Sequence, residues 1–222
     1  MKIENIEVSG FIAALRGMRN PMESWAKSDT TYYCTGKISM PWQEYGIVLL
    51  EHPIIGPNDM KLALSLIRGG GAHRKFLRQI MICWDITIPR AIWQELDTYK
   101  VSTVRNSCST MHKLGSRDLE LCDFEGEEIP LEWLALINKF GAEYRADKTP
   151  EKLHRLKMHL PESFLQKATY SFNYEAALKM YYDRKDHRMY EWSGKEGICE
   201  WITRLPYMQI FIDEMMSAKA RG

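Results

Sequence analysis

The chain has 222 residues, 45% of them hydrophobic and 27% charged, which is ordinary for a soluble protein with one large core or two small ones. A formal net charge of +1 excludes a general attraction to nucleic acid or to a membrane surface, so any anion site must be local. Five scattered cysteines without a CxxC pair favour reduced thiols in the cytoplasm over a disulfide framework or a metal site. They are Cys34, Cys83, Cys108, Cys122 and Cys199.

Strands and helices are both predicted in the first half of the chain. Strict alternation from Ile80 to Ile88 indicates a strand with one apolar face. The apolar run after Pro57 indicates a buried helix that ends at Gly69–Gly71. The remaining expectations are an edge strand over residues 1–9, a short helix over Phe11–Met18, and a helix from Arg90 to about Lys100 that Pro89 begins.

The second half is predicted to be mostly helical. We expect helices over Pro130–Ala142, Pro150–His159, Leu160 to about Lys185, Gly197–Thr203, and after Pro206. The acidic stretch Asp118–Glu128 is expected to be a surface loop or hairpin. No domain boundary is apparent, so these elements predict one α+β domain over residues 1–222. The first residues carry acids and no long apolar run, so no signal peptide is expected. No stretch approaches the roughly 18 apolar residues that cross a bilayer.

The segment from Gln94 to Leu114 is rich in small polar donors. It holds three cations, seven hydroxyl-bearing side chains, an Asn, a Cys and a His. Such a composition suits an anion with many oxygens, such as a nucleotide phosphate and its sugar. A solvated connection rich in Ser and Thr is the plain alternative.

The order of landmarks resembles the flavin-dependent thymidylate synthases over about residues 57–114 and 150–192. In that family a helix ending in Gly leads to a GH-containing loop, an apolar strand, a helix and a signature RHRxxSxNExSxRY. Here His73 follows Gly71-Ala72, and the helix after Pro89 leads to the signature position. Downstream, the family has a Leu-Pro, an Asn on a long helix, an Arg and an HAQxE-like end. The matching positions are Leu160-Pro161, Asn173, Arg184, His187 and Glu191.

The signature itself departs from the family pattern. Thr98, Tyr99 and Lys100 stand where the family has Arg-His-Arg. Its Asn-Glu falls on Arg105 and Asn106, with Ser-x-Arg-Tyr on Cys108 to Met111. A slip of one residue would instead match Asn106 with the Asn and Ser109 with the Ser. Both registers stay open.

The resemblance implies a mixed sheet packed with long helices, a homotetramer, and FAD bound between subunits with dUMP stacked on the flavin. Methylenetetrahydrofolate and NADPH would then convert dUMP to dTMP, with the cofactor carrying the redox work. It places His73, Lys75, Tyr99, Lys100 and Asn173 at the FAD. It places Glu95, Ser107, Cys108, Ser109, Lys157 and Arg184 at the nucleotide, with Ser107–Ser109 as a phosphate-binding turn.

Each of these residues also has a plain interpretation. Arg184 at a helix end is more often a surface charge, and His73 is most simply a loop residue. Asn173, placed in mid-helix, is unfavourable enough to suggest a partner. Cys108 among cations could be a nucleophile with a lowered pKa, although an idle thiol is the commoner case. No His or acid pair has metal-ligand spacing, so no metal is predicted.

Two functions from different classes follow. The first is a flavin-dependent transferase acting on a deoxypyrimidine monophosphate. The second is a non-catalytic nucleotide-binding protein that keeps the scaffold but not the chemistry. Binding to nucleic acid is disfavoured, because the net charge is near zero and the aromatic residues are scattered among apolar positions.

Overall fold

The computed structural model describes residues 1–32, 44–51 and 53–220; Cys34 lies outside them. The strands are β1 Lys2–Ser9, β2 Thr31–Tyr32, β3 Ile47–Leu49, β4 Pro53–Ile54, β5 Met81–Pro89, β6 Val104–Ser107 and β7 Leu165–Asn173. The α-helices are α1 Phe11–Gly17, α2 Pro57–Arg68, α3 Arg90–Leu96, α4 Leu131–Ala146, α5 Pro150–Met158, α6 Tyr174–Arg184, α7 Tyr190–Ser193, α8 Ile198–Thr203 and α9 Met208–Lys219. Short 3₁₀ turns include η4 Arg74–Gln79, η5 Leu121–Asp123 and η6 Glu125–Glu127.

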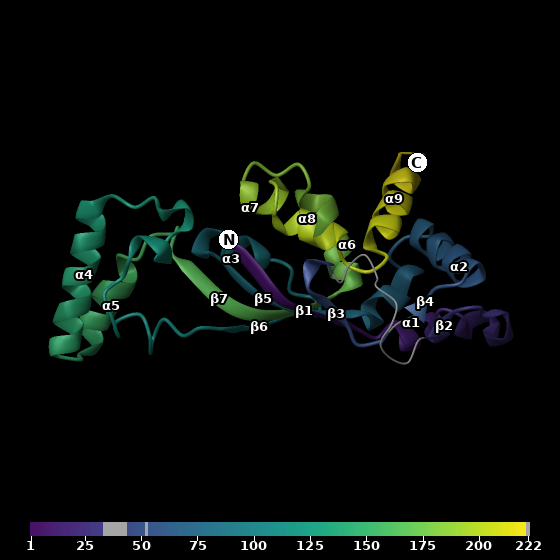
Figure 1. The fold of residues 1–222 in the computed structure, drawn as a ribbon, viewed down its shortest axis with the longest axis horizontal. Coiled ribbons are helices and arrows are strands. Elements are labelled where there is room, and N and C mark those ends of the chain that lie inside the picture. Colours follow the sequence, from purple (N-terminus) through teal and green to yellow (C-terminus); the bar gives the residue numbers. More distant parts are fainter. Residues whose placement is uncertain (33–43, 52, 221–222) are drawn as a thin grey trace. The chain divides into compact units, whose positions relative to one another are not determined.

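A five-stranded sheet in the order β3-β1-β5-β7-β6 is the centre of the fold (Figure 1). β1 and β3 run parallel, with Ile6 opposite Ile47. β2 and β4 form a separate antiparallel pair. The predicted α+β class with a mixed sheet and helices is confirmed. The prediction that residues 1–9 are an edge strand is wrong, because β1 lies between β3 and β5.

The predicted alternation of β5 is confirmed. Ile82, Trp84, Ile86 and Ile88 are fully buried on one face of the strand, while Met81 on the other is exposed. Successive side chains of a strand point to opposite faces, so this single periodic run is enough to place the strand in the core. Pro89 closes β5, and α3 follows at once.

Helix α3 is shorter than predicted. It ends at Leu96 instead of continuing to Lys100, and the Thr98 hydroxyl then donates a hydrogen bond to the Glu95 carbonyl at 2.7 Å. Such a local side-chain bond competes with continuation of a helix. Tyr99 and Lys100 therefore belong to a loop.

The prediction of one long helix from Leu160 to Lys185 is wrong. Leu165–Asn173 is strand β7, and the helix, α6, begins only at Tyr174. Ala168, Tyr170 and Phe172 are buried at every second position, which is the period of a strand. Pairing with β5 and β6 on its two sides decides the conformation of this segment.

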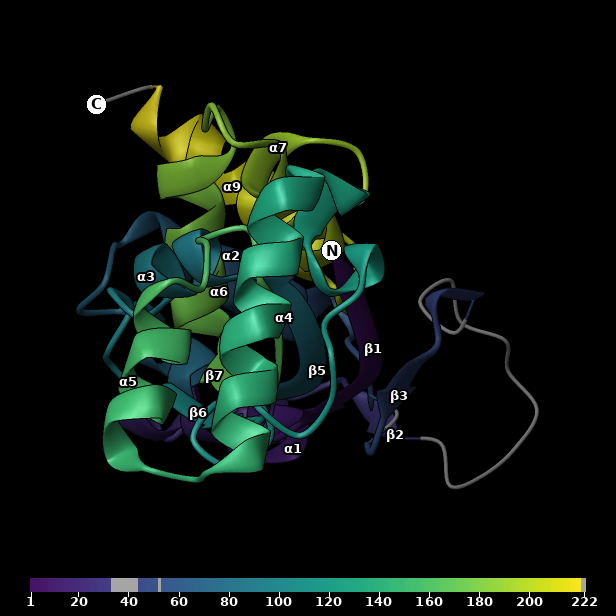
Figure 2. The same ribbon diagram turned by 90° about the vertical axis from the view of Figure 1, so that its left-hand side faces the viewer.

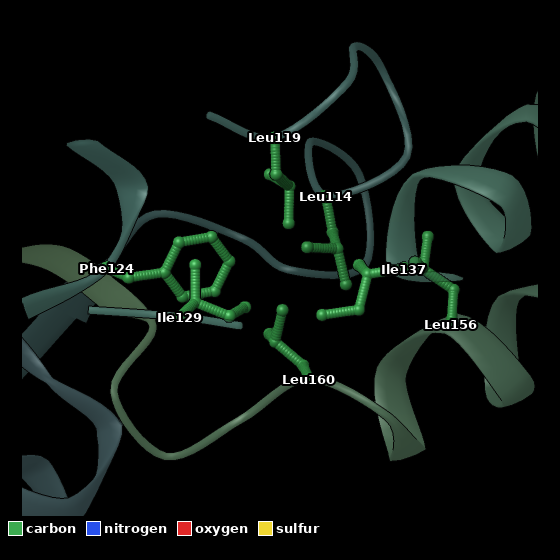
Figure 3. Packing of buried hydrophobic residues seen from close by; sticks show 7 residues of the cluster. All are labelled: Leu114, Leu119, Phe124, Ile129, Ile137, Leu156 and Leu160. Atoms are coloured by element: carbon green, nitrogen blue, oxygen red, sulfur yellow. The ribbon is translucent and has the colours of Figure 1, made fainter. Parts of the chain in front are cut away.

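The acidic stretch Asp118–Glu128 is not a simple surface excursion. It forms the turns η5 and η6, and it places Leu119 and Phe124 in a buried cluster with α4 and α5. Figure 3 shows these side chains converging, and Figure 2 shows α4 and α5 side by side. Ile137 of α4 is fully buried there. The predicted helices Pro130–Ala142 and Pro150–His159 are confirmed as α4 and α5.

The chain divides into two compact units. One comprises Met1–Ile3, Asp85–Thr98 and Arg105–Thr169; the other comprises Glu4–Trp84, Tyr99–Val104 and Tyr170–Gly222. Within the second unit, α6 packs against η4, α8 and α9. β1, β5 and β7 each contribute residues to both units. A single domain over residues 1–222 remains a proposal.

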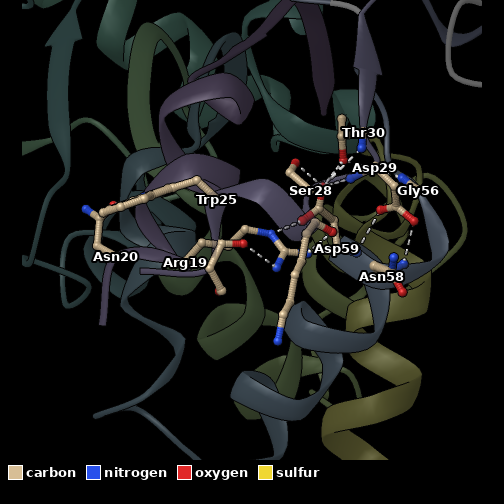
Figure 4. A network of polar contacts seen from close by, with 11 residues as sticks. Arg19, Asn20, Trp25, Ser28, Asp29, Thr30, Gly56, Asn58 and Asp59 are labelled. Carbon is tan, nitrogen blue, oxygen red and sulfur yellow. Dashed lines mark hydrogen bonds and ion pairs between the residues drawn. The ribbon is translucent and has the colours of Figure 1, made fainter. Parts of the chain in front are cut away.

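A buried ion pair ties residues 19–30 to the first turn of α2 (Figure 4). Arg19 Nε lies 2.6 Å from Asp59 Oδ1, and the two side chains are 4% and 0% exposed. The other oxygen, Oδ2, accepts hydrogen bonds from the Ser28 hydroxyl and from the Thr30 backbone and hydroxyl. Because every buried charge needs such partners, this network holds an otherwise irregular segment in place.

Candidate functional site

Arg184, the last residue of α6, is held by two aromatic side chains. Its Nε donates a hydrogen bond to the Tyr99 hydroxyl at 3.3 Å, and its guanidinium carbon lies 5.2 Å from the centre of the Trp192 ring. The Tyr99 hydroxyl in turn donates to Asp183 Oδ2 at 3.3 Å. A guanidinium restrained in this way is pre-organised for a planar, bidentate anion.

The pKa of the Tyr99 phenol is raised, chiefly by burial. Burial raises the pKa of Tyr99, Asp183 raises it further, and the hydrogen bond and charge of Arg184 oppose both. Lys179 adds a second cation, with its ammonium 2.6 Å from Asp183 Oδ2 and 5.8 Å from the centre of the Tyr99 ring. Asp183 therefore contacts both the Lys179 ammonium and the Tyr99 hydroxyl.

The turn before η4 is open and cationic. Gly70 has φ +84°, and a Cβ built there would meet nothing within 4 Å. His73 and Lys75 are exposed beside this turn, and Arg78 donates from Nη2 to the Gly71 carbonyl at 3.4 Å. A pocket of about 470 Å³ includes His73 and Lys75 in its wall. Such a donor set suits a group that carries phosphates.

Asn173 caps α6 and does not lie in mid-helix. Its Oδ1 accepts a hydrogen bond from the Ala176 backbone at 2.9 Å, and its side chain is 2% exposed. Asn is among the preferred residues at an N-cap, which gives this buried polar group a structural role without any ligand. Lys100, in contrast, is exposed in the loop after α3.

The hydroxyl-rich turn after β6 is organised by its own polar groups. The Cys108 backbone donates to the Lys167 carbonyl at 2.9 Å, and its carbonyl accepts from Gln166 Nε2 at 2.8 Å. The Ser109 hydroxyl accepts from the backbone N–H groups of Met111 and His112 at 3.2 and 3.3 Å. Ser107 and Cys108 are exposed. A phosphate bound here would have to displace Ser109 from those two amides.

Arg105, in strand β6 just before this turn, is a structural residue. It donates to Asp97 Oδ2 and to Gln166 Oε1, each at 2.7 Å, and its guanidinium lies 3.9 Å above the Trp93 ring. With three partners inside one unit, it anchors β6. Glu95 is half-buried on α3.

Lys157 on α5 has an unusual contact. Its ammonium lies 3.1 Å from the sulfur of Met111, in the wall of a pocket of about 540 Å³. Two of the predicted nucleotide residues therefore have different partners. Arg184 donates a hydrogen bond to Tyr99, whereas the Lys157 ammonium contacts the sulfur of Met111.

Two solved structures share the fold of this chain. A crystal structure of the flavin-dependent thymidylate synthase ThyX from Helicobacter pylori, complexed with FAD and dUMP, matches with a TM-score of 0.63 over 96% of this chain and 99% of that chain, at 15% identity. A second structure of ThyX from the same organism with FAD and dUMP matches with a TM-score of 0.64 over 97% and 99%, at 14% identity. The chain has a ThyX-like fold.

The ThyX-like fold is shared without close sequence similarity. No family model matches the chain, and no curated protein matches it. Tyr99, which the resemblance set at the middle of the Arg-His-Arg signature, accepts a hydrogen bond from Arg184.

Three members of the Arg184 cluster, Lys179, Asp183 and Trp192, were not predicted from the sequence. Asp183 links Lys179 and Tyr99, and Trp192 stacks with the guanidinium. The four-residue spacing of Lys179 and Asp183 was a usable signal, because such pairs meet on a helix face. Trp192 had no comparable signal, since α7 has only four residues.

Neither metal binding nor a membrane span has support within residues 1–32, 44–51 and 53–220. In those ranges no three His, Cys, Asp or Glu side chains gather in a way that could hold a metal ion. No helix in the same part of the chain has the length and apolar character to cross a bilayer.

Proposed function

We propose that this protein is a flavin-dependent transferase that adds a one-carbon group to a deoxypyrimidine monophosphate. The leading reaction is conversion of dUMP to dTMP with methylenetetrahydrofolate and NADPH. The observation that carries the proposal is a ThyX-like fold along nearly the whole chain, together with an Arg184 that Tyr99 and Trp192 orient. We further propose a cytoplasmic homotetramer as the working form.

FAD fits the residues of the η4 turn. The open glycine turn with His73 and Lys75 offers positive charge and room for a pyrophosphate. When bound, the cofactor supplies the redox chemistry of the reaction. The side chains proposed to bind and orient it are His73, Lys75, Tyr99, Lys100 and Asn173.

The nucleotide is proposed to bind through Arg184. Its guanidinium can form two parallel hydrogen bonds with a phosphate or with the edge of a pyrimidine. Tyr99 and Trp192 reduce the entropy lost when these bonds form, because they restrict the side chain beforehand. Glu95, the Ser107–Ser109 turn and Lys157 remain proposed nucleotide contacts.

The altered signature predicts slow chemistry. Thr98 replaces an arginine of the family pattern, and loss of one fixed charge at a developing anion costs on the order of 2–4 kcal/mol. Lys100 retains part of that charge. A non-catalytic nucleotide-binding protein is the second candidate, and the fixed roles of Arg105 and Ser109 favour it.

Purification followed by an absorbance scan and calorimetric titration tests the proposal. A bound flavin spectrum and preferential binding of dUMP over dTMP and dCMP support the transferase. Arg184→Leu should weaken dUMP binding by about tenfold or more. Arg188→Leu, at an exposed position nearby, should not weaken it. A colourless protein that takes up no added FAD but still binds nucleotide supports the second candidate. Failure to bind either contradicts both.

Cys108→Ala separates a thiol nucleophile from an idle thiol. The side chain is exposed, and the turn is held through its backbone. We therefore expect dUMP binding and any dTMP formation to stay within about twofold of the wild type. Unchanged binding with complete loss of turnover would restore the nucleophile.

A further inference from the structure

The pocket beside the α4–α5 pair has a wall of apolar and aromatic side chains. Met111, Tyr144, Leu153 and Met158 supply most of that wall. Its volume of about 540 Å³ is in the usual range for small-molecule sites. The Tyr144 ring packs closely against Gly115, where an added Cβ would lie only 2.4 Å from the ring. The pocket therefore has a firm aromatic side.

The charges at this pocket are all basic or neutral. Lys148, His154 and Lys157 line it, and no Asp or Glu does. The nearby carboxylates already have partners, since Asp147 binds Lys152 and Glu143 binds Arg155. Within the described parts of the chain, neither Lys148 nor Lys157 forms an ion pair.

The Lys157 ammonium has only a weak hydrogen-bond acceptor in its present contact. Its ammonium lies 3.1 Å from Met111 Sδ, and a thioether is a weak acceptor compared with a carboxylate or sulfonate oxygen. The side chain is half-buried, so water compensates only in part. An anion at this position would gain a charge-assisted hydrogen bond.

The remaining polar groups do not suit a nucleobase. No Asn or Gln lines the pocket, and the Thr149 hydroxyl already accepts from the Lys152 backbone. A base edge needs paired donors and acceptors, which this wall lacks. We propose that the pocket binds a small organic anion with an apolar body, whose charged group meets Lys157 and Lys148. The proposal is an alternative to the nucleotide contact proposed for Lys157, and it does not depend on the transferase function.

Calorimetric titration of the full chain with two matched probes measures separately how the negative charge and the apolar rings of a ligand contribute to affinity. Naphthalene-1-sulfonate carries the negative charge, and naphthalene-1-sulfonamide has the same rings without it. The sulfonate should bind more tightly by about tenfold. Lys157→Met should remove that advantage and leave sulfonamide binding unchanged. Lys139→Met, at an exposed lysine of α4 outside the pocket, should change neither.

A second variant tests the proposal independently in case Lys157→Met does not fold. Leu153→Trp fills the pocket and should abolish binding of both probes, with the melting temperature confirming that the protein is folded. Equal affinity for the two probes, unchanged binding in folded Lys157→Met or Leu153→Trp, or displacement of the sulfonate by stoichiometric dUMP would overturn the proposal. Displacement would instead make this pocket part of the nucleotide site.

Discussion

Arg184 obtains its orientation from two aromatic residues outside its own helix. Tyr99 precedes it by 85 positions and accepts its Nε hydrogen bond, and Trp192 lies against the guanidinium in the short helix α7. An unrestrained arginine would sample many rotamers and lose that freedom on binding. Tyr99 is thus a positioning residue, and its effect on ligand affinity is separable from its packing.

Tyr99→Phe tests this positioning role. The variant keeps the ring and removes the hydroxyl, so we expect dUMP affinity to fall by about fivefold while the melting temperature changes little. Isothermal titration measures the affinity. Tyr182 is an exposed tyrosine on α6, the helix that carries Arg184. Tyr182→Phe is the control and should bind dUMP as the wild type does. Equal affinity in the two variants would show that the Tyr99 hydroxyl does not orient Arg184.

Asp59 is expected to make stability depend on pH. Burial acts to raise its pKa, but hydrogen bonds from Thr30, Ser28 and Arg19, with the charge of Arg19, lower it overall. A carboxyl whose pKa is lower in the folded state stabilises fully above its unfolded pKa. That contribution is lost as the pH falls below about 4 and through the folded pKa.

Asp59→Asn should lower the free energy of unfolding by about 3–5 kcal/mol at pH 7, because it leaves Arg19 buried without its counterion. Urea unfolding at pH 7, 5 and 3 measures the difference from the wild type. This difference should shrink at pH 3, because the Asp59 carboxyl of the unfolded chain then binds a proton more readily than the folded protein does. A difference that stays constant with pH would show that the ion pair does not control stability.

Helix α6 illustrates how an element boundary creates a role for one residue. β7 ends at Asn173, and the same residue caps the first turn of α6 through its Oδ1. Proposed cofactor binding by Asn173 must therefore be separated from capping. Asp also caps well, and its carboxylate near the N-terminus is favourable, but its charge would repel an anionic cofactor.

Asn173→Ala should lower the free energy of unfolding by about 1 kcal/mol, whereas Asn173→Asp should stay close to the wild type. Chemical denaturation measures both. FAD titration then distinguishes the roles, because a cofactor contact predicts weaker FAD binding in the stable Asp variant. Undiminished FAD affinity in Asn173→Asp would leave Asn173 with capping alone.

On the scale of the whole molecule, each compact unit has buried residues of its own. The cluster around Ile137 joins α4, α5 and the acidic turns within one unit (Figure 3). Units of this kind can open with different free energies. A cavity in one cluster should therefore increase local opening first within the unit that contains the cluster.

Ile137→Ala should lower stability by about 2–5 kcal/mol, since Ile137 is fully buried. Hydrogen–deuterium exchange should show the earliest increase in α4, α5 and Asp118–Glu128. Leu131→Ala on the same helix, at a side chain that is 67% exposed, should have little effect. A uniform increase along the chain would show that the two units open together.

Local periodicity was sufficient for several elements. The alternation of Ile82, Trp84 and Ile86 predicted β5, and the glycines after Arg68 predicted the end of α2, because neighbours a few residues apart determine both signals. The α+β class followed from such elements. Among the candidate site residues, sequence landmarks singled out Tyr99 and Arg184 separately.

Tertiary structure alone decided the rest. Leu165–Asn173 has no break that separates it from the helix after it, and only pairing with β5 and β6 makes it a strand. The same pairing moved Asn173 from mid-helix to a cap. The contacts of Tyr99 with Arg184, and of Lys157 with Met111, join residues that are 85 and 46 positions apart. Such contacts depend on how the helices and strands pack together, and local patterns in the sequence do not determine that packing.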